Sequence, residues 1–250
     1  MIFTIAFREL KSLFLSPLAW SILAILQLIL AYLFLTQIET FTTFQVELAG
    51  IENAPGMTDI IVLPLFGNAS IILLLVSPLL TMRLVCEERR NKTLSLLLSA
   101  PISGTEIILG KFFGILAFLV VVVILVSIMP ISLLLGGELD FGKFICNIFA
   151  LLLLVSAFAS LGLYMSCIAS HPTIAAMSSF GLLLLLWILD WTAGLKGQGS
   201  ELLHYLSILK HFQHIQTGLL STVDISYFLL FSSTFLILSI RRLESDRLQK

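Results

Sequence analysis

Long apolar runs dominate this chain, and short polar segments separate them. A helix needs about 20 mainly apolar residues to cross a bilayer. The runs that meet or approach this length are residues 17–37, 63–84, 112–135, 143–169, 174–195 and 225–240, the last being short and expected to begin near Val223. Membrane strands would instead alternate over about 10 residues. The pattern therefore predicts an all-α membrane protein with six transmembrane helices.

Basic residues are unevenly divided between the two sides of these spans. With the N-terminus placed inside the cell, eleven of the fourteen Lys and Arg residues fall in cytoplasmic segments, and the other three are Lys143, Lys196 and Lys210. The outer loop 38–62 holds four acids and no base. Because cytoplasmic loops carry an excess of Lys and Arg, both chain ends are predicted to lie in the cytoplasm.

Composition agrees with a chain that spans the membrane. Hydrophobic residues make up 58% of the sequence, charged residues make up 12%, and the mean hydropathy is +1.08. Soluble domains average about 45–50% apolar and about 25% charged residues. The net charge of −1 gives no basis for a nucleic-acid partner. Cys86, Cys146 and Cys167 form neither a disulfide framework nor a metal motif, so buried apolar roles are expected for them and no cofactor is expected.

Two further segments have helical patterns without being long or apolar enough to span. In residues 1–14, the apolar positions lie on one side of a helix, and Arg8, Glu9, Lys11 and Ser12 lie on the other. This pattern predicts an amphipathic helix at the membrane interface. Residues 196–222 on the outer side are predicted as either an interfacial helix or two re-entrant half-helices. Gly218 would supply the break between such halves.

A third segment, the cytoplasmic loop 83–111, predicts a short helix between two spans. Thr93 can cap this helix, and Pro101 must end it or follow its end. Its apolar face consists of Leu94, Leu97 and Leu98. Because so short a helix has no core of its own to cover this face, it is expected to lie against the bilayer or in a groove of a partner protein.

Charged and capping residues flank this leucine face. The preceding run is Glu87, Glu88, Arg89 and Arg90, which reads either as a solvated helix end or as a polar rim around a partner contact. Ser103 and Glu106 have the spacing of a capping box. They predict the start of a helix that continues through Lys111 into the third span.

The chain resembles the ABC-2 type permeases, the membrane subunits of ATP-binding-cassette exporters. It is most similar to those of the gliding-motility and nitrous-oxide-reductase accessory type. The resemblance rests on FRELKSLFLSPLAW (7–20), PLLTMRLVCEERRNKTLSLLLSAPISGTEIILGKFFG (78–114) and LSILKHFQHIQTGLLSTVDISYF (206–228). The chain departs from the family pattern where Lys92-Thr93 replaces Gly-Thr and where Ser95 replaces Glu.

The resemblance implies one permease domain over residues 1–250 in the inner membrane of a bacterium, in contact with membrane lipid. A second permease copy or a paralogue would complete the path, and a separate cytoplasmic ATPase would bind the ATP. The sequence has no P-loop motif of its own, so no enzymatic activity is expected of this chain. The residues implied in coupling to the ATPase are Glu87, Glu88, Arg89, Arg90, Thr93, Leu94, Leu97, Leu98, Pro101, Glu106 and Lys111.

Two alternative functions stay open. An ion-coupled secondary carrier would need charged groups or broken helices near the midplane, and Asp190 is the one candidate acid. Asp190 also fits an interfacial position, because Trp187 and Trp191 flank it. A membrane subunit that assembles other proteins without transport is the third possibility. His211 and His214 share a helix face, but with no evident third ligand they do not predict a metal site.

Overall fold

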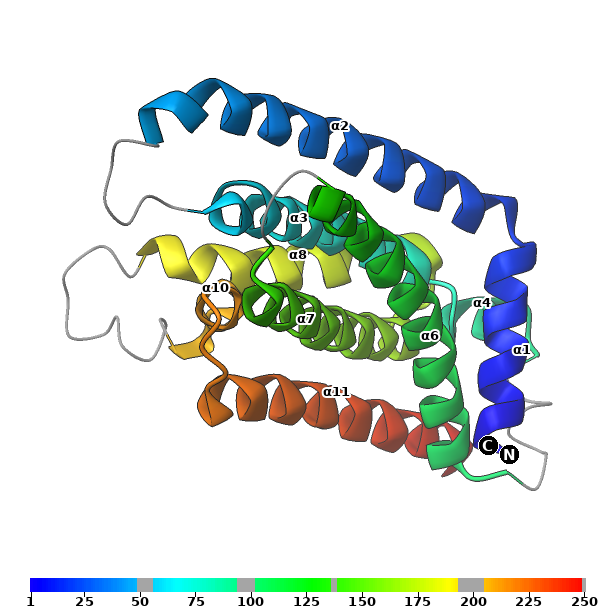
Figure 1. The fold of residues 1–250 in the computed structure, drawn as a ribbon. Coiled ribbons are helices and arrows are strands. Elements are labelled where there is room, and N and C mark those ends of the chain that lie inside the picture. The colour runs from blue at the N-terminus through cyan, green and yellow to red at the C-terminus, as the bar shows by residue number, and fades with distance from the viewer. Residues whose placement is uncertain (49–55, 94–101, 136–138, 193–204, 249–250) are drawn as a thin grey trace.

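The computed structural model describes residues 1–48, 56–93, 102–135, 139–192 and 205–248, which form a bundle of helices (Figure 1). No strand occurs in these ranges. In chain order the elements are α1 (Ile2–Leu15), α2 (Pro17–Leu48), η1 (Thr58–Val62), α3 (Leu63–Thr81), α4 (Cys86–Arg90), α6 (Gly104–Ile131), η2 (Ser132–Leu135), α7 (Phe141–Ile168), α8 (Pro172–Thr192), α10 (Ile208–Gln216) and α11 (Thr222–Leu248). The leucine face predicted at Leu94, Leu97 and Leu98, together with Pro101, lies outside the described residues.

Six of these helical stretches are long and apolar enough to cross a membrane, which confirms the predicted number of spans. They are Pro17–Thr43, Thr58–Arg90, Gly104–Leu134, Phe141–Ile168, Pro172–Leu189 and Thr222–Arg247. The last of them begins at Thr222, close to the start predicted near Val223. The helix α11 continues past the apolar run that ends at Ile240, through the charged residues that follow.

The helix α7 forms the centre of the bundle. It contacts α3, α6, α8, α10 and α11. In its most apolar stretch 72% of the residues are buried, against 22% in α2 and 17% in α8. Figure 1 shows α2 and α11 at opposite edges of the bundle, with α7 between them. The apolar residues left exposed on α2 and α8 are available to lipid or to another membrane protein.

A small residue on α7 allows a close crossing with α3. A Cβ atom added to Gly162 would lie 2.8 Å from Cβ of Thr81 and closer still to its hydroxyl oxygen. One turn further along α7, the hydroxyl of Ser166 accepts hydrogen bonds from the backbone N–H groups of Val85 and Cys86, at 3.0 and 3.1 Å. Ser166 therefore satisfies the backbone where the chain turns between α3 and α4.

The start of α1 and the end of α11 lie at the same end of the bundle, as six crossings require (Figure 1). We call this the terminal end, and it also holds α4 and the start of α6. The opposite end holds α10 and the start of α7. Placement of the terminal end in the cytoplasm stays a prediction from the charge distribution.

Helix α1 differs from the sequence expectation in the direction of one polar side chain. Its buried residue is Ile5, which packs against α6. Glu9, predicted on the solvated face, turns toward the inside of the bundle instead. The apolar side chains of Phe3 and Phe7 remain 88% and 68% exposed, so contact of this face with lipid stays a prediction.

Helix α10 is the described helix of the predicted outer segment. Its buried residues include Phe212 and Ile215, and it contacts α7, α8 and α11. Gly218 follows it with a backbone φ of +94°, a left-handed conformation that favours glycine. The break predicted at Gly218 therefore lies between α10 and α11, and the part of the segment before residue 205 lies outside the described residues.

Candidate functional site

A buried lysine joins three helices at the terminal end. Lys111 of α6 is 1% exposed. Its ammonium nitrogen lies 3.0 Å from Glu9 Oε1 on α1 and 2.7 Å from Glu88 Oε1 on α4. Arg8 adds a second cation, 2.9 Å from Glu9 and 3.5 Å from Glu88. We call these four residues the Lys111 cluster. A buried ammonium group is tolerated because charged hydrogen-bond partners replace its water.

Two glycines on α6 make this cluster possible. Added Cβ atoms would lie 2.7 Å from Ile5 Cβ at Gly110 and 2.7 Å from Glu9 Cβ at Gly114. Real Cβ atoms essentially never approach that closely. Glycines four positions apart on one helix lie on the same face and let a second helix approach. Their absent side chains therefore bring the Glu9 carboxylate within reach of Lys111.

The charge state of Glu9 follows from its surroundings. Burial on its own would raise the pKa of the Glu9 carboxyl, because it penalises the charged form. The ammonium of Lys111 and the guanidinium of Arg8 outweigh burial and hold this pKa below its ordinary value. The cluster thus keeps Glu9 ionised near neutral pH. One oxygen of Glu88, Oε2, is buried with no hydrogen-bond partner among the described residues.

A second set of ionic contacts links α4 to the last helix. The guanidinium of Arg89 pairs with Asp246 of α11 and also donates to the carbonyl of Ile168 at the end of α7, at 3.3 Å. Arg242 lies 3.7 Å from the other oxygen of Asp246. The short α4 is therefore held at one side by the Lys111 cluster and at the other by α7 and α11.

The end of α4 has a Schellman geometry with Lys92 at the position that favours glycine. The N–H of Thr93 donates to the carbonyl of Glu88 at 3.0 Å, and the N–H of Lys92 donates to the carbonyl of Arg89 at 3.2 Å. Between these bonds Lys92 has φ +58°. Such helix ends favour glycine at this position. The Gly-Thr of the resembling permeases fits this geometry, and Lys92 adopts it at a conformational cost.

The hydroxyl of Thr93 donates to the carbonyl of Glu88 at 3.2 Å, at the end of α4. The helix that Thr93 was predicted to cap falls outside the described residues, so its role as an N-cap stays a prediction.

Glu106 forms the capping box that the sequence predicted. The N–H of Glu106 donates to the hydroxyl of Ser103 at 3.1 Å, and the N–H of Ser103 donates to Glu106 Oε2 at 3.1 Å. Next to this cap, Arg247 of α11 donates to the carbonyl of Ile102 at 3.4 Å. The carboxylate of Glu106 therefore serves the start of α6.

A cavity of about 350 Å³ opens beside the Lys111 cluster. Besides the cluster, its lining includes Ser12 of α1, Arg83, Glu87 and Thr93. Glu87 and Arg90 make none of the ion pairs described here. The resemblance to ABC-2 permeases selected Lys111 and Glu88 but did not select Arg8 and Glu9. These two residues precede the first span and were assigned to a solvated helix face.

At the opposite end an aspartate binds both histidines that the sequence singled out. The Nδ1 atoms of His211 and His214 each lie 2.6 Å from a carboxylate oxygen of Asp224. His211 also stacks on Tyr227 with ring centroids 4.2 Å apart, and its Nε2 lies 2.9 Å from the carbonyl of Tyr205. Among the described residues no group of three potential ligands could hold a metal ion. By binding both histidines, Asp224 connects α10 to the first turn of α11.

Asp190, the candidate acid of the carrier alternative, belongs to α8 (Pro172–Thr192). The surroundings of its side chain lie outside the described residues, so the choice between an interfacial position and a midplane role stays open.

Comparison with known proteins bears on the whole chain. A search of curated proteins gave no match. The family model described as "ABC-2 family transporter protein" matches residues 3–241, which cover the Lys111 cluster, the first five spans and most of the last span. Members of this family are membrane components of transporters that normally work with an ABC ATPase. This multi-pass membrane protein belongs to the ABC-2 transporter family.

Proposed function

We propose that this chain is the permease subunit of an ABC exporter, driven by a separate ATPase that binds at the terminal end. The finer assignment to the gliding-motility and nitrous-oxide-reductase accessory type is part of the proposal and rests on the motifs quoted above. A second permease copy or a paralogue would complete the path in a bacterial inner membrane. ATP would bind to the partner subunit.

The observation that carries the proposal is the Lys111 cluster. The segment from Glu87 to Lys111 leaves the second span and enters the third, and both of its ends contribute to the cluster through Glu88 and Lys111. A force applied to this segment would act on α1 through Glu9 and on α11 through the Arg89–Asp246 pair. Rigid-body movement of packed elements is a recognised way to transmit such a shift.

The residues that would contact the ATPase divide into two groups. Leu94, Leu97 and Leu98 would supply the apolar contact that excludes water. Glu87 and Arg90, which remain outside the ionic contacts described here, would form the charged rim and tune the association rate. Glu88, Arg89, Glu106 and Lys111 would instead hold the base of the segment in place.

The test is co-purification of the permease with its co-expressed ATPase, followed by ATP hydrolysis measurements in lipid nanodiscs. We expect the double variant Leu94→Asp/Leu97→Asp to lose the ATPase. We expect Lys111→Met to retain the ATPase but to lose the effect of the permease on its turnover. The matched control is Lys143→Met, which removes a lysine that pairs with Asp59 at 2.7 Å at the opposite end.

Two results would overturn the proposal. One is binding of the ATPase to the Leu94→Asp/Leu97→Asp variant as tightly as to the natural chain. The other is full transport with no ATPase present, which would instead favour an ion-coupled carrier. In that case Asp190→Asn would be the next variant to measure.

A further inference from the structure

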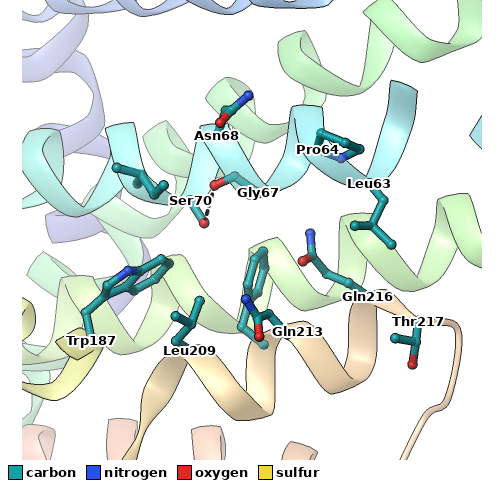
Figure 2. A pocket seen from close by; sticks show the side chains of 12 residues that line it. Leu63, Pro64, Gly67, Asn68, Ser70, Trp187, Leu209, Gln213, Gln216 and Thr217 are labelled. Carbon is teal, nitrogen blue, oxygen red and sulfur yellow. Dashed lines mark hydrogen bonds between the residues drawn. The ribbon is translucent and has the colours of Figure 1, made fainter. Parts of the chain in front are cut away.

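A cavity of about 470 Å³ lies at the opposite end of the bundle, between α3 and α10, with α8 beside it (Figure 2). It is remote from the Lys111 cluster, and the proposed coupling does not use it. Figure 2 shows α3 and α10 running alongside each other, with Trp187 at one end of the cavity and Thr217 at the other. Its volume is within the range of small-molecule sites, which are typically about 300–1,000 Å³.

The cavity contains a preoriented amide. Gln216 is 3% exposed, and its side chain stands up from α10 toward α3 (Figure 2). Its Nε2 donates to Asn147 Oδ1 at 3.1 Å, and Asn147 in turn donates to the carbonyl of Gln216 at 3.2 Å. Gln216 Oε1 accepts no hydrogen bond from the residues that the structure describes. Gln216 lines the cavity, so this amide oxygen can accept a hydrogen bond from a group that enters the cavity.

Other neutral polar groups share the cavity. Gln213 is exposed on α10, and its amide makes no hydrogen bond within the described part of the chain. Thr217 and Asn68 add a hydroxyl and an amide. None of the described lining residues carries a charge. A ligand with a net charge would lose its water here without gaining a counter-charge, which disfavours it strongly.

The rest of the lining is apolar. Phe212 is fully buried, and Trp187 is half-buried in the last part of the α8 span. Ile71 belongs to the span that includes α3 and is 50% exposed, so it is available to lipid chains. The cavity thus combines hydrogen-bonding groups, an aromatic ring and continuity with an apolar helix surface. Aromatic rings with nearby polar groups suit ligands that have one apolar and one polar side.

We propose that this cavity binds the uncharged, hydroxyl-bearing head group of an amphiphile whose apolar chains lie along α3. The hydroxyl groups would donate to Gln216 Oε1 and exchange hydrogen bonds with the Gln213 amide. The ring of Trp187 would cover the apolar face of the head group. Binding at this site requires no ATPase, so it stands apart from the coupling proposed above.

The test uses the permease alone, in phospholipid nanodiscs, with Trp187 as the fluorescent reporter after Trp20→Phe and Trp191→Phe. The probe is a monoglucosyl diacylglycerol. The comparison lipids are diacylglycerol, which lacks the sugar, and phosphatidylglycerol, which is anionic. We expect a saturable change in Trp187 emission with the glucolipid and none with the other two.

Two variants and one control separate recognition from folding. Gln216→Leu is expected to weaken glucolipid binding about tenfold, the scale of one lost hydrogen bond to a buried group. Since Gln216 also pairs with Asn147, Gln213→Leu provides a variant with no such partner, and we expect it to weaken binding threefold or more. Gln27→Leu on α2 is the matched control, because Gln27 bonds to the carbonyl of Leu125 and does not line the cavity.

Three results would overturn this inference. The first is an equal response to diacylglycerol, which would mean that the head group is not recognised. The second is preference for phosphatidylglycerol. The third is glucolipid binding unchanged in both Gln216→Leu and Gln213→Leu. Loss of ATPase coupling in the earlier experiment would leave the binding result unaffected, so the two proposals fail separately.

Discussion

Lys111 and Glu9 are separated by 102 positions in the chain, yet the ammonium of one lies 3.0 Å from the carboxylate of the other. Lys111 is 1% exposed on its side chain and Glu9 is 14% exposed. The pair fastens the helix before the first span to the helix of the third. Glu88 completes it from α4, at the end of the second span.

The first prediction concerns the strength of this buried contact. Lys111→Met leaves two carboxylates near each other with only Arg8 to balance them. We expect a loss of roughly 3 kcal/mol in the free energy of unfolding, which is typical when one partner of a buried ion pair is removed. The measurement is denaturant unfolding in mixed micelles.

A double-mutant cycle separates the pair from its surroundings. Glu9→Gln in the Lys111→Met background should destabilise the protein by less than it does in the natural chain, because the partner is already absent. Strictly additive effects would show that the two side chains do not interact. Lys143→Met, at the opposite end, is expected to be additive with Glu9→Gln.

The second prediction is that the stability of the protein falls at acid pH because Glu9 becomes protonated. The pKa of Glu9 in the folded protein lies below its ordinary value of 4.5, so the folded state favours the ionised form. The stability that Glu9 contributes is therefore complete above about pH 5. It declines as the pH falls below the ordinary pKa of Glu9 and then through its lower pKa in the folded protein. Melting temperatures of the natural chain and of Glu9→Gln should converge at acid pH.

The control for this acid effect is Glu39→Gln, because Glu39 is an exposed acid on α2. Its melting temperature should follow that of the natural chain at every pH. A constant difference between Glu9→Gln and the natural chain down to pH 3 would contradict the assignment.

The third prediction follows from the left-handed backbone of Lys92. Lys92→Gly should raise the free energy of unfolding by about 0.5–1 kcal/mol, because relief of left-handed strain exceeds the added entropy of the unfolded chain. Asn91→Gly is the matched control. Asn91 has φ −81°, where glycine brings no relief, so this substitution should be neutral or destabilising. A stabilisation equal for both variants would exclude the conformational explanation.

The fourth prediction tests the crossing of α3 and α7. Gly162→Ala places a methyl group against Thr81 and should destabilise the protein by about 2 kcal/mol, as is usual for overpacking. Thr81→Ala added to it should recover part of the loss. Gly181→Ala in α8 is the control, since an added Cβ there meets nothing within 4 Å, and it should be neutral or stabilising. Equal melting temperatures for the two alanine variants would argue against a tight crossing.

Local chemistry made much of the terminal end predictable. The capping box at Ser103 and Glu106 is set by residues three positions apart, and the end of α4 by the six consecutive residues from Glu88 to Thr93. The resemblance to ABC-2 permeases identified Lys111 and Glu88 together. It did not identify Glu9, the second partner of Lys111, because a polar residue on an amphipathic helix is assigned to the solvated face when its neighbours are unknown.

The same limit applies at the opposite end. His211 and His214 were visible as a pair on one helix face, and the last span was expected to begin near Val223, next to Asp224. Only the turn at Gly218 brings α10 back against α11 and places both histidines on one carboxylate.

The number of spans, their approximate bounds and the predicted side of the terminal end depend on hydropathy and charge, which the sequence alone determines. Each such property is a sum over neighbouring residues, so it needs no knowledge of the fold. The burial of Lys111, the close crossing at Gly162 and the preoriented amide of Gln216 depend on helices that are distant along the chain. Only the tertiary structure decides these, because removing a polar group from water is favourable only where a specific partner takes the place of water.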